Sequence, residues 1–171
     1  MSKSRKVLAI LIVIIFVIIL ISRNAGNFRI IKNSERTKRY NQSLMDVDRI
    51  FYKVSTQKGL GRAFIDFADD SVIIIRDNEF PIIGKVELAK YYLYHENDIK
   101  SLYWDPIRAE SSNDGLQGYT FGRWEYQDAD KKGKRVTKYG DYLTVWKRQK
   151  DGSWKYIYDG GGSTPGQWIL Q

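Results

Sequence analysis

The amino-acid sequence predicts an α+β domain that follows one hydrophobic, membrane-spanning N-terminal helix. Three observations lead to this assignment. Residues 7–21 form an unbroken apolar run, apolar residues then recur at helical steps of three and four, and the second half consists of short strand-like segments separated by turn residues. Helices that precede neighbouring strands are typical of a curved antiparallel sheet with the helices packed on one face.

The N-terminal segment has the composition of a membrane anchor. We divide it into a basic tail at residues 1–6, a transmembrane helix at 7–22 and a polar linker at 23–35. The apolar run would extend roughly 22 Å as a helix, less than the ~30 Å of a bilayer core, and flanking basic side chains would reach the headgroups. A cleaved signal sequence is the alternative, although Arg23 stands where cleavage favours a small residue. The basic tail favours an extracytoplasmic domain, which would be secreted or periplasmic after cleavage.

Composition excludes several classes of function. The sequence has no cysteine, and this rules out disulfides, thiolate zinc sites and cysteine nucleophiles. Of the charged residues, nine basic and one acidic lie within residues 1–40, whereas the remainder holds 19 of each sign. The net charge of +8 therefore flanks the apolar run, where anionic lipid would meet it. We expect a lipid bilayer as the partner of residues 7–22 and no nucleic-acid binding by the domain.

The domain is assigned to residues 36–164, with a C-terminal tail at 165–171. Its predicted elements are a helix over 34–56, a short helix through Phe67 that ends at Asp69-Asp70, a strand over 71–76, a third helix that ends near Tyr94, and strands over 101–111, 116–126, 136–148 and 154–161. Turn residues separate the last four strands at 113–115, 131–133 and 151–152.

The turns also predict how the strands pair. A two-residue turn at Asp151-Gly152 would place Thr144 opposite Asp159 and Trp146 opposite Ile157. A turn centred on Lys132 would place three glycines opposite large aromatic residues, in the pairs Gly118–Trp146, Gly122–Tyr142 and Gly140–Trp124. Such complementary sizes favour this register over one shifted by two residues.

The predicted register separates two faces of the sheet. The residues of one face, which we take as a ligand pocket, are Thr120, Trp124, Tyr142, Thr144, Trp146, Ile157 and Asp159. The opposite face carries Tyr119, Phe121, Leu143, Val145, Tyr156 and Tyr158. Both faces are aromatic. We expect helices to cover the first, and a homodimer contact through Tyr119, Phe121, Tyr156 and Tyr158 to cover the second.

Four segments of the chain resemble the nuclear transport factor 2-like superfamily, and within it the SnoaL-like branch and domain of unknown function 4440. They are GRAFIDFADDSVIII, GKVELAKYY, GYTFGRWEY and YGDYLTVWKRQKDGSWKYIYDGG, which together span most of residues 40–162. The resemblance implies a cone-shaped fold with a pocket between three helices and the concave face of the sheet, and frequent dimers through the opposite face. Members include ketosteroid isomerases, polyketide cyclases and dehydratases, as well as proteins that only bind or scaffold.

Carried onto this chain, the resemblance implies that Thr144, Trp146, Ile157 and Asp159 face the pocket. Thr144 stands where an isomerase would have the acid of its oxyanion hole. No residue matches the isomerase base or the His–Asp pair of a dehydratase. These departures argue against either activity.

Asp159 is the candidate catalytic residue. A carboxylate in an apolar, aromatic cleft would have a raised pKa and could act as a general base or acid. Alternatively, it accepts hydrogen bonds from neighbours such as Thr144 or Tyr142 and has a structural role. His95 is the sole histidine and is expected at the surface. The sequence shows no metal motif and no cofactor fingerprint.

These observations predict a membrane-anchored domain that binds a small hydrophobic ligand without established catalysis or cofactor. One alternative is a lyase or isomerase that acts on a hydrophobic substrate, with Asp159 as general base. Another is a scaffold subunit of a membrane complex. A cone filled by Trp104, Trp124 and Trp146 would favour the scaffold.

Overall fold

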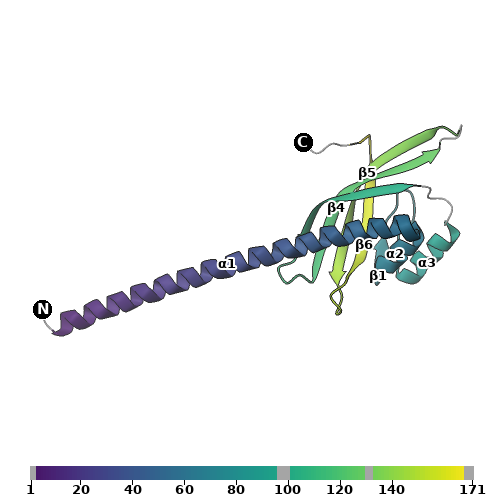
Figure 1. The fold of residues 1–171 in the computed structure, drawn as a ribbon. Helices are drawn as coiled ribbons and strands as arrows, with labels where there is room; N and C mark the ends of the chain where they lie inside the picture. The colour runs from purple at the N-terminus through teal and green to yellow at the C-terminus, as the bar shows by residue number, and fades with distance from the viewer. Residues whose placement is uncertain (1–2, 96–100, 130–132, 168–171) are drawn as a thin grey trace. The chain divides into compact units, whose positions relative to one another are not determined.

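The computed structural model describes residues 3–95, 101–129 and 133–167, apart from the side chains of residues 3–17, 24–33 and 128–129. The chain divides into two units, Met1–Lys38 and Arg39–Gln171. In chain order the elements are α1 (Lys3–Lys58), α2 (Leu60–Phe67), β1 (Ala68–Ile74), β2 (Ile82–Ile83), α3 (Lys85–Tyr94), β3 (Leu102–Ser111), β4 (Gln117–Ala129), β5 (Arg135–Arg148) and β6 (Trp154–Thr164) (Figure 1).

The first unit is helical throughout its described length. Helix α1 continues through residues 23–35, the segment predicted as a linker. Among the described residues, no helix combines the length and the apolar character that crossing a bilayer requires. Most of the predicted anchor at 7–22 lies outside the described side chains, because these begin at Ile18.

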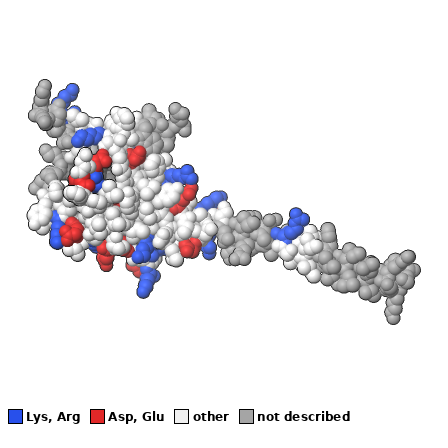
Figure 2. Space-filling view, turned by 180° about the vertical axis from the view of Figure 1, so that it is seen from behind, with Lys and Arg blue, Asp and Glu red and all other residues white. Residues whose placement is uncertain are grey.

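The second unit contains one six-stranded sheet in the order β2-β1-β6-β5-β4-β3. Helices α2 and α3 and the part of α1 from Arg39 onward supply core residues against it, among them Leu44, Phe64 and Leu88. The sheet was predicted to be antiparallel, but β1 pairs with β6 in parallel. The sheet is therefore mixed, because the strand that follows the short second helix joins the last strand of the chain. On the face of this unit seen in Figure 2, basic and acidic atoms are interspersed.

The predicted register of β4 and β5 is confirmed. Gly118 pairs with Trp146, Gly122 with Tyr142 and Gly140 with Trp124. A Cβ atom on Gly140 would lie 2.1 Å from the indole ring of Trp124. The glycines are thus required by the aromatic rings that lie across from them.

The predicted register of β5 and β6 is correct at one end and wrong at the other. Thr144 pairs with Asp159 as expected, but Trp146 pairs with Tyr156 because a bulge interrupts the ladder at Ile157. The connection has three residues instead of two: the Gln149 amide donates to Ser153 O at 2.8 Å, and Gly152 adopts a φ of 87°. A three-residue hairpin loop with glycine in the left-handed conformation is a common alternative to the two-residue turn.

Because of the bulge, the positions predicted for two residues of β6 are wrong. Tyr156 was predicted on the outer face, but it is fully buried and its hydroxyl donates to Phe64 O at 2.8 Å. Ile157 was predicted opposite Trp146 on the pocket face, and it has no partner in the ladder.

Two further expectations concern turns. Asp69 and Asp70 were predicted to end the second helix, but both belong to β1, where Asp69 Oδ1 accepts the Ser71 amide at 3.1 Å. The turn predicted at 131–133 falls mainly on residues 130–132, which lie outside the described residues.

Candidate functional site

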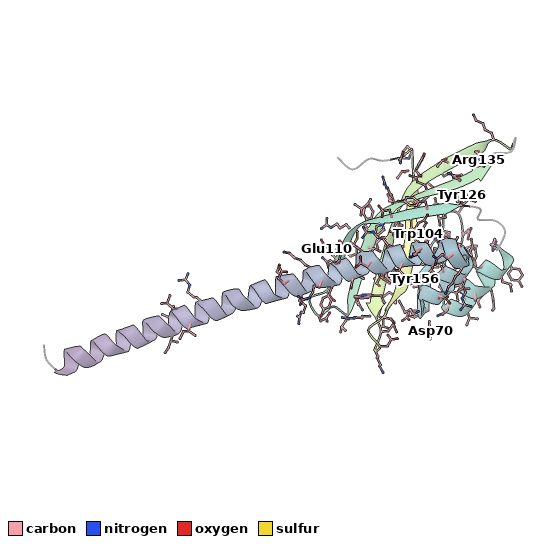
Figure 3. The ribbon with its side chains drawn as sticks, in the orientation of Figure 1. Asp70, Trp104, Glu110, Tyr126, Arg135 and Tyr156 are labelled. Atoms are coloured by element: carbon pink, nitrogen blue, oxygen red, sulfur yellow. The ribbon has the colours of Figure 1, made fainter. Side chains whose placement is uncertain are left out.

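A cavity of about 450 Å³ lies between the helices of the second unit and the inner face of the sheet. Aromatic rings form a large part of its walls, and charged, small and aliphatic residues line the rest. Trp104 lines the cavity and Tyr156 lies in the core, and both are seen beside α1 in Figure 3. Their ring centroids lie 4.9 and 5.7 Å from that of Phe51 on this helix. The lining residues that matter below are Phe51, Leu60, Arg76, His95, Trp104, Trp124, Tyr142, Thr144 and Asp159.

Four of the seven predicted pocket residues line this cavity: Trp124, Tyr142, Thr144 and Asp159. Thr120 and Trp146 are fully buried behind the wall, where Trp146 Nε1 donates to Thr120 Oγ1 at 2.9 Å. Ile157, at the bulge, does not line it. The sheet register therefore brings Tyr142, Thr144 and Asp159 to the cavity, whereas Thr120 lies behind its wall and the bulge takes Ile157 away from it.

Asp159 is held by a cation and a hydroxyl. Arg76, directly after β1, places Nη1 3.2 Å from Asp159 Oδ2, and Thr144 Oγ1 donates to Asp159 Oδ1 at 2.7 Å. Arg76 Nη2 also donates to the Tyr92 hydroxyl at 3.3 Å, and the guanidinium lies 5.1 Å from the centroid of the Phe64 ring. Burial alone would lower the pKa of Arg76, but Tyr92 and Asp159 raise it above its ordinary value. The polar end of the cavity is therefore a fixed ion pair.

A second carboxyl group, on Asp48 of α1, lies behind the wall and is only 1% exposed. Its Oδ1 accepts the Trp104 indole N–H at 2.9 Å, and its Oδ2 accepts the Tyr142 hydroxyl at 3.0 Å. Burial raises the pKa of Asp48 to about 6, although hydrogen bonds from Thr120, Trp104 and Tyr142 act in the opposite direction. Burial and the adjacent Asp48 raise the pKa of Tyr142, so its hydroxyl keeps its proton.

Asp48 and Arg76 were not among the residues predicted for the site. Asp48 had a detectable signal, because Leu44, Asp48, Phe51 and Ser55 lie at steps of four, three and four and all four are buried. An acidic residue on the buried stripe of a helix is unusual and needs partners. Arg76 had no local signal, since its partner is 83 residues away in sequence.

His95 lies at the cavity rather than on the open surface, and its ring stacks on Tyr91 at a centroid distance of 4.3 Å. Its Nδ1 lies 2.8 Å from Tyr91 O, so this nitrogen carries the hydrogen. Within the described part of the chain, no cluster of three histidine or acidic side chains could hold a metal ion.

The sequence matches no protein-family profile and no curated protein sequence. Solved structures do match. A ketosteroid isomerase-like protein from Erwinia carotovora is 15% identical, with a TM-score of 0.60 over 72% of this chain and 96% of that one. A nuclear transport factor 2-like protein from Salmonella enterica is 10% identical, with a TM-score of 0.58 over 77% and 96%.

A third solved structure is a putative calcium/calmodulin-dependent protein kinase II association domain from Xanthomonas campestris. It is 15% identical, with a TM-score of 0.56 over 70% of this chain and 86% of that one. At such identities the likeness concerns the fold, and the SnoaL-like branch stays a prediction. The domain therefore has the fold of the nuclear transport factor 2-like superfamily.

Proposed function

We propose that the domain binds a small, largely apolar molecule that carries at least one polar group. The observation behind this proposal is the cavity of about 450 Å³, whose aromatic walls lead to the Arg76–Asp159 pair. Ligand pockets are typically apolar with a few polar groups at defined positions, and this cavity has both features.

The arrangement of the tryptophans supports binding over a purely scaffolding role. Trp104 and Trp124 form part of the wall, with their indole N–H groups bonded to Asp48 and to Asp141 O. Trp146 belongs to the core behind them. The three rings thus leave the cone open.

The test is binding of 2-acetylnaphthalene, an uncharged aromatic ketone, to the full chain in mild detergent, with native mass spectrometry to detect any co-purifying molecule. Leu60→Trp adds a large ring at the cavity wall and should weaken binding at least tenfold. Leu93→Trp is the matched control, because Leu93 is 72% exposed on α3 and lies outside this cavity. Equal binding by both variants would place the probe elsewhere and overturn the proposal.

Non-catalytic binding is better supported than the lyase or isomerase alternative. A general base needs a free lone pair directed at the substrate. Arg76 and Thr144 each occupy one lone pair on an oxygen of Asp159, which reduces the number left for a substrate. If Asp159 nevertheless acts as a base, Asp159→Asn would abolish turnover of a bound substrate while leaving its affinity intact.

We further propose that residues 7–22 anchor the domain to a membrane, with the domain on the extracytoplasmic side. The support is the 15-residue apolar run with Lys3, Arg5 and Lys6 before it. Alkaline carbonate extraction of a membrane fraction should leave the chain in the pellet, and the N-terminal peptide should be intact by mass spectrometry. A mature chain that begins after residue 22 would establish the cleaved-signal alternative.

A homodimer through the outer face of the sheet is also proposed, without the buried Tyr156. Its predicted members Tyr119, Phe121 and Tyr158 are half-buried there, and Leu143 is 36% exposed. Light scattering of the detergent-solubilised chain should give two copies per particle. Leu143→Lys should convert these to single copies, whereas Leu93→Lys on α3 should not.

A further inference from the structure

One buried carboxyl group holds two walls of the cavity. Trp104 and Tyr142 come from different strands, β3 and β5, and both line the cavity. The indole N–H and the phenol O–H point away from it, each toward one oxygen of Asp48. Asp48 itself does not line the cavity, so it acts on the site through these two rings.

The hydrogen atoms available to a ligand can be counted. Trp and Tyr side chains each have a single polar hydrogen, and those of Trp104 and Tyr142 are bonded to Asp48. The hydroxyl of Thr144 is likewise bonded to Asp159, and Trp124 Nε1 to Asp141 O. While Asp48 is ionised, none of these four wall groups offers the cavity a hydrogen.

Protonation of Asp48 changes that count. A carboxylate only accepts hydrogen bonds, whereas a carboxylic acid also donates one. The acid proton can be donated to the Tyr142 hydroxyl oxygen, after which the hydroxyl hydrogen of Tyr142 is free to turn to the cavity. Trp104 can keep its bond to the other oxygen. The wall then presents one additional donor.

The titratable and charged neighbours of Asp48 leave it poised for this change. Asp159 on β6 disfavours its negative charge, while Arg76 compensates Asp159. On α1 itself, Arg49 lies 3.9 Å from Asp105 of β3 and makes no bond to Asp48. Tyr142 on β5 stays protonated. The carboxyl therefore has neutral donors but no cation of its own, in keeping with its pKa of about 6.

We infer that Asp48 is a positioning residue whose protonation releases the Tyr142 hydroxyl as a donor to the ligand, so that proton uptake and binding of an acceptor-bearing ligand favour each other. This inference rests on the proposed function, because it assigns regulation to the same cavity. Linkage requires the effect to be reciprocal: the ligand must also promote proton uptake by Asp48.

The experiment compares 2-acetylnaphthalene, which has a carbonyl acceptor, with 2-ethylnaphthalene, which has none. One additional neutral hydrogen bond corresponds to roughly five-fold in affinity. The ketone should therefore bind about five-fold tighter at pH 5 than at pH 7.5, and the hydrocarbon equally at both. Asp48→Asn, an uncharged isostere of the protonated acid, should bind the ketone tightly at both pH values.

His95 also lines the cavity, and it is the sole histidine of the sequence. His95→Gln is therefore the matched control. Whatever its effect on absolute affinity, it should retain the ratio between pH 5 and pH 7.5. Loss of the ratio in this variant would assign the effect to His95 and overturn the inference.

A measurement without ligand tests the same link. The Trp104 indole N–H resonance, assigned with Trp104→Phe, should titrate with a midpoint near pH 6 and should not titrate in Asp48→Asn. A flat titration in the wild-type chain overturns the inference, as does ketone binding that is independent of pH. Failure of both naphthalenes to bind at either pH would instead remove the proposed function, and the inference with it.

Discussion

Asp48 and Asp159 are both buried in the domain, but they are held in different ways. Asp159 pairs with the guanidinium of Arg76 and accepts a hydroxyl from Thr144. Asp48 has only uncharged donors, which include an indole and a phenol at 2.9 and 3.0 Å and the Thr120 hydroxyl. Among groups of the same chemistry, a cation at hydrogen-bond distance stabilises the ionised form, whereas neutral donors do not fully offset the loss of water.

The two carboxyl groups therefore have different roles at the same cavity. The Arg76–Asp159 end forms a permanent polar surface, in which the two opposite charges lie at hydrogen-bond distance. The Asp48 end is neutral or charged according to the pH. The following variants test this distinction.

Arg76→Met should have the largest effect, because it leaves Asp159 buried without its cation. We expect a loss of about 3 to 4 kcal/mol in the free energy of unfolding, measured by urea denaturation at pH 7.5. The double variant Arg76→Met with Asp159→Asn should recover much of it. Arg62→Met is the control, since it removes the exposed pair with Asp66 and should cost less than about 1 kcal/mol. Similar losses for both arginine variants would contradict the distinction.

Asp48→Asn should raise the free energy of unfolding at neutral pH, whereas Arg76→Met should lower it. The folded chain holds a proton on Asp48 up to a pKa of about 6, and the unfolded chain releases it near 3.8. The favourable contribution of this proton is therefore complete below pH 4 and is lost as the pH rises through 6, by about 2 to 3 kcal/mol. The asparagine variant should lack this loss and exceed the wild type in stability at pH 7.5. Parallel stability curves for the two proteins between pH 4 and 7 would show that Asp48 is not the titrating group.

Thr144→Val removes the hydroxyl that donates to the charged Asp159 and keeps the shape of the side chain. Hydrogen bonds to charged groups contribute about 2 kcal/mol, and we expect a loss of that size in urea denaturation. Thr56→Val on α1 is matched to it, because the Thr56 hydroxyl is exposed and donates to Lys53 O within the same helix. It should change stability by less than about 0.5 kcal/mol. A Thr144→Val loss no larger than this control would mean that Arg76 alone satisfies Asp159.

Arg49→Gln should have the smallest effect. Its contacts with Asp46 and Asp105 are both 3.9 Å long and half-exposed, and such pairs contribute less than about 0.5 kcal/mol each. The midpoint of the Trp104 indole titration should also stay near pH 6. A marked rise in that midpoint would reveal that Arg49 supplies Asp48 with a cation, and the contrast with Asp159 would then fail.

The pairing of glycines with large aromatic residues explains why the sequence predicts the fold and the strand part of the site. Complementary sizes across β4 and β5 require glycine wherever the opposite residue is large, as at Gly122 and Gly140. That register places Tyr142 and Thr144 on the inner face, and the correct part of the next register adds Asp159. Periodicity and turn residues are therefore sufficient for this part of the cavity.

The remainder depends on information that short-range patterns do not carry. Asp151-Gly152 is compatible with hairpin loops of two or three residues, and only the longer loop places Tyr156 in the core. Arg76 reaches Asp159 through a parallel pairing of β1 with β6, which no local turn specifies. The spacing of apolar residues predicts that Asp48 lies on the buried side of its helix. Its partners could not be predicted in this way, because they come from β3 and β5.

The bulge at Ile157 has a consequence for how one strand serves two purposes. Residues 156 and 159 are an odd number of positions apart, and in a regular strand they would point to opposite sides. The inserted residue turns both inward, so β6 contributes Tyr156 to the core and Asp159 to the cavity. The alternation of side chains along β6 therefore shifts by one position at Ile157. A regular strand of the same length, with Ile157 paired in the ladder, would have to give up either the aromatic core contact or the carboxylate of the site.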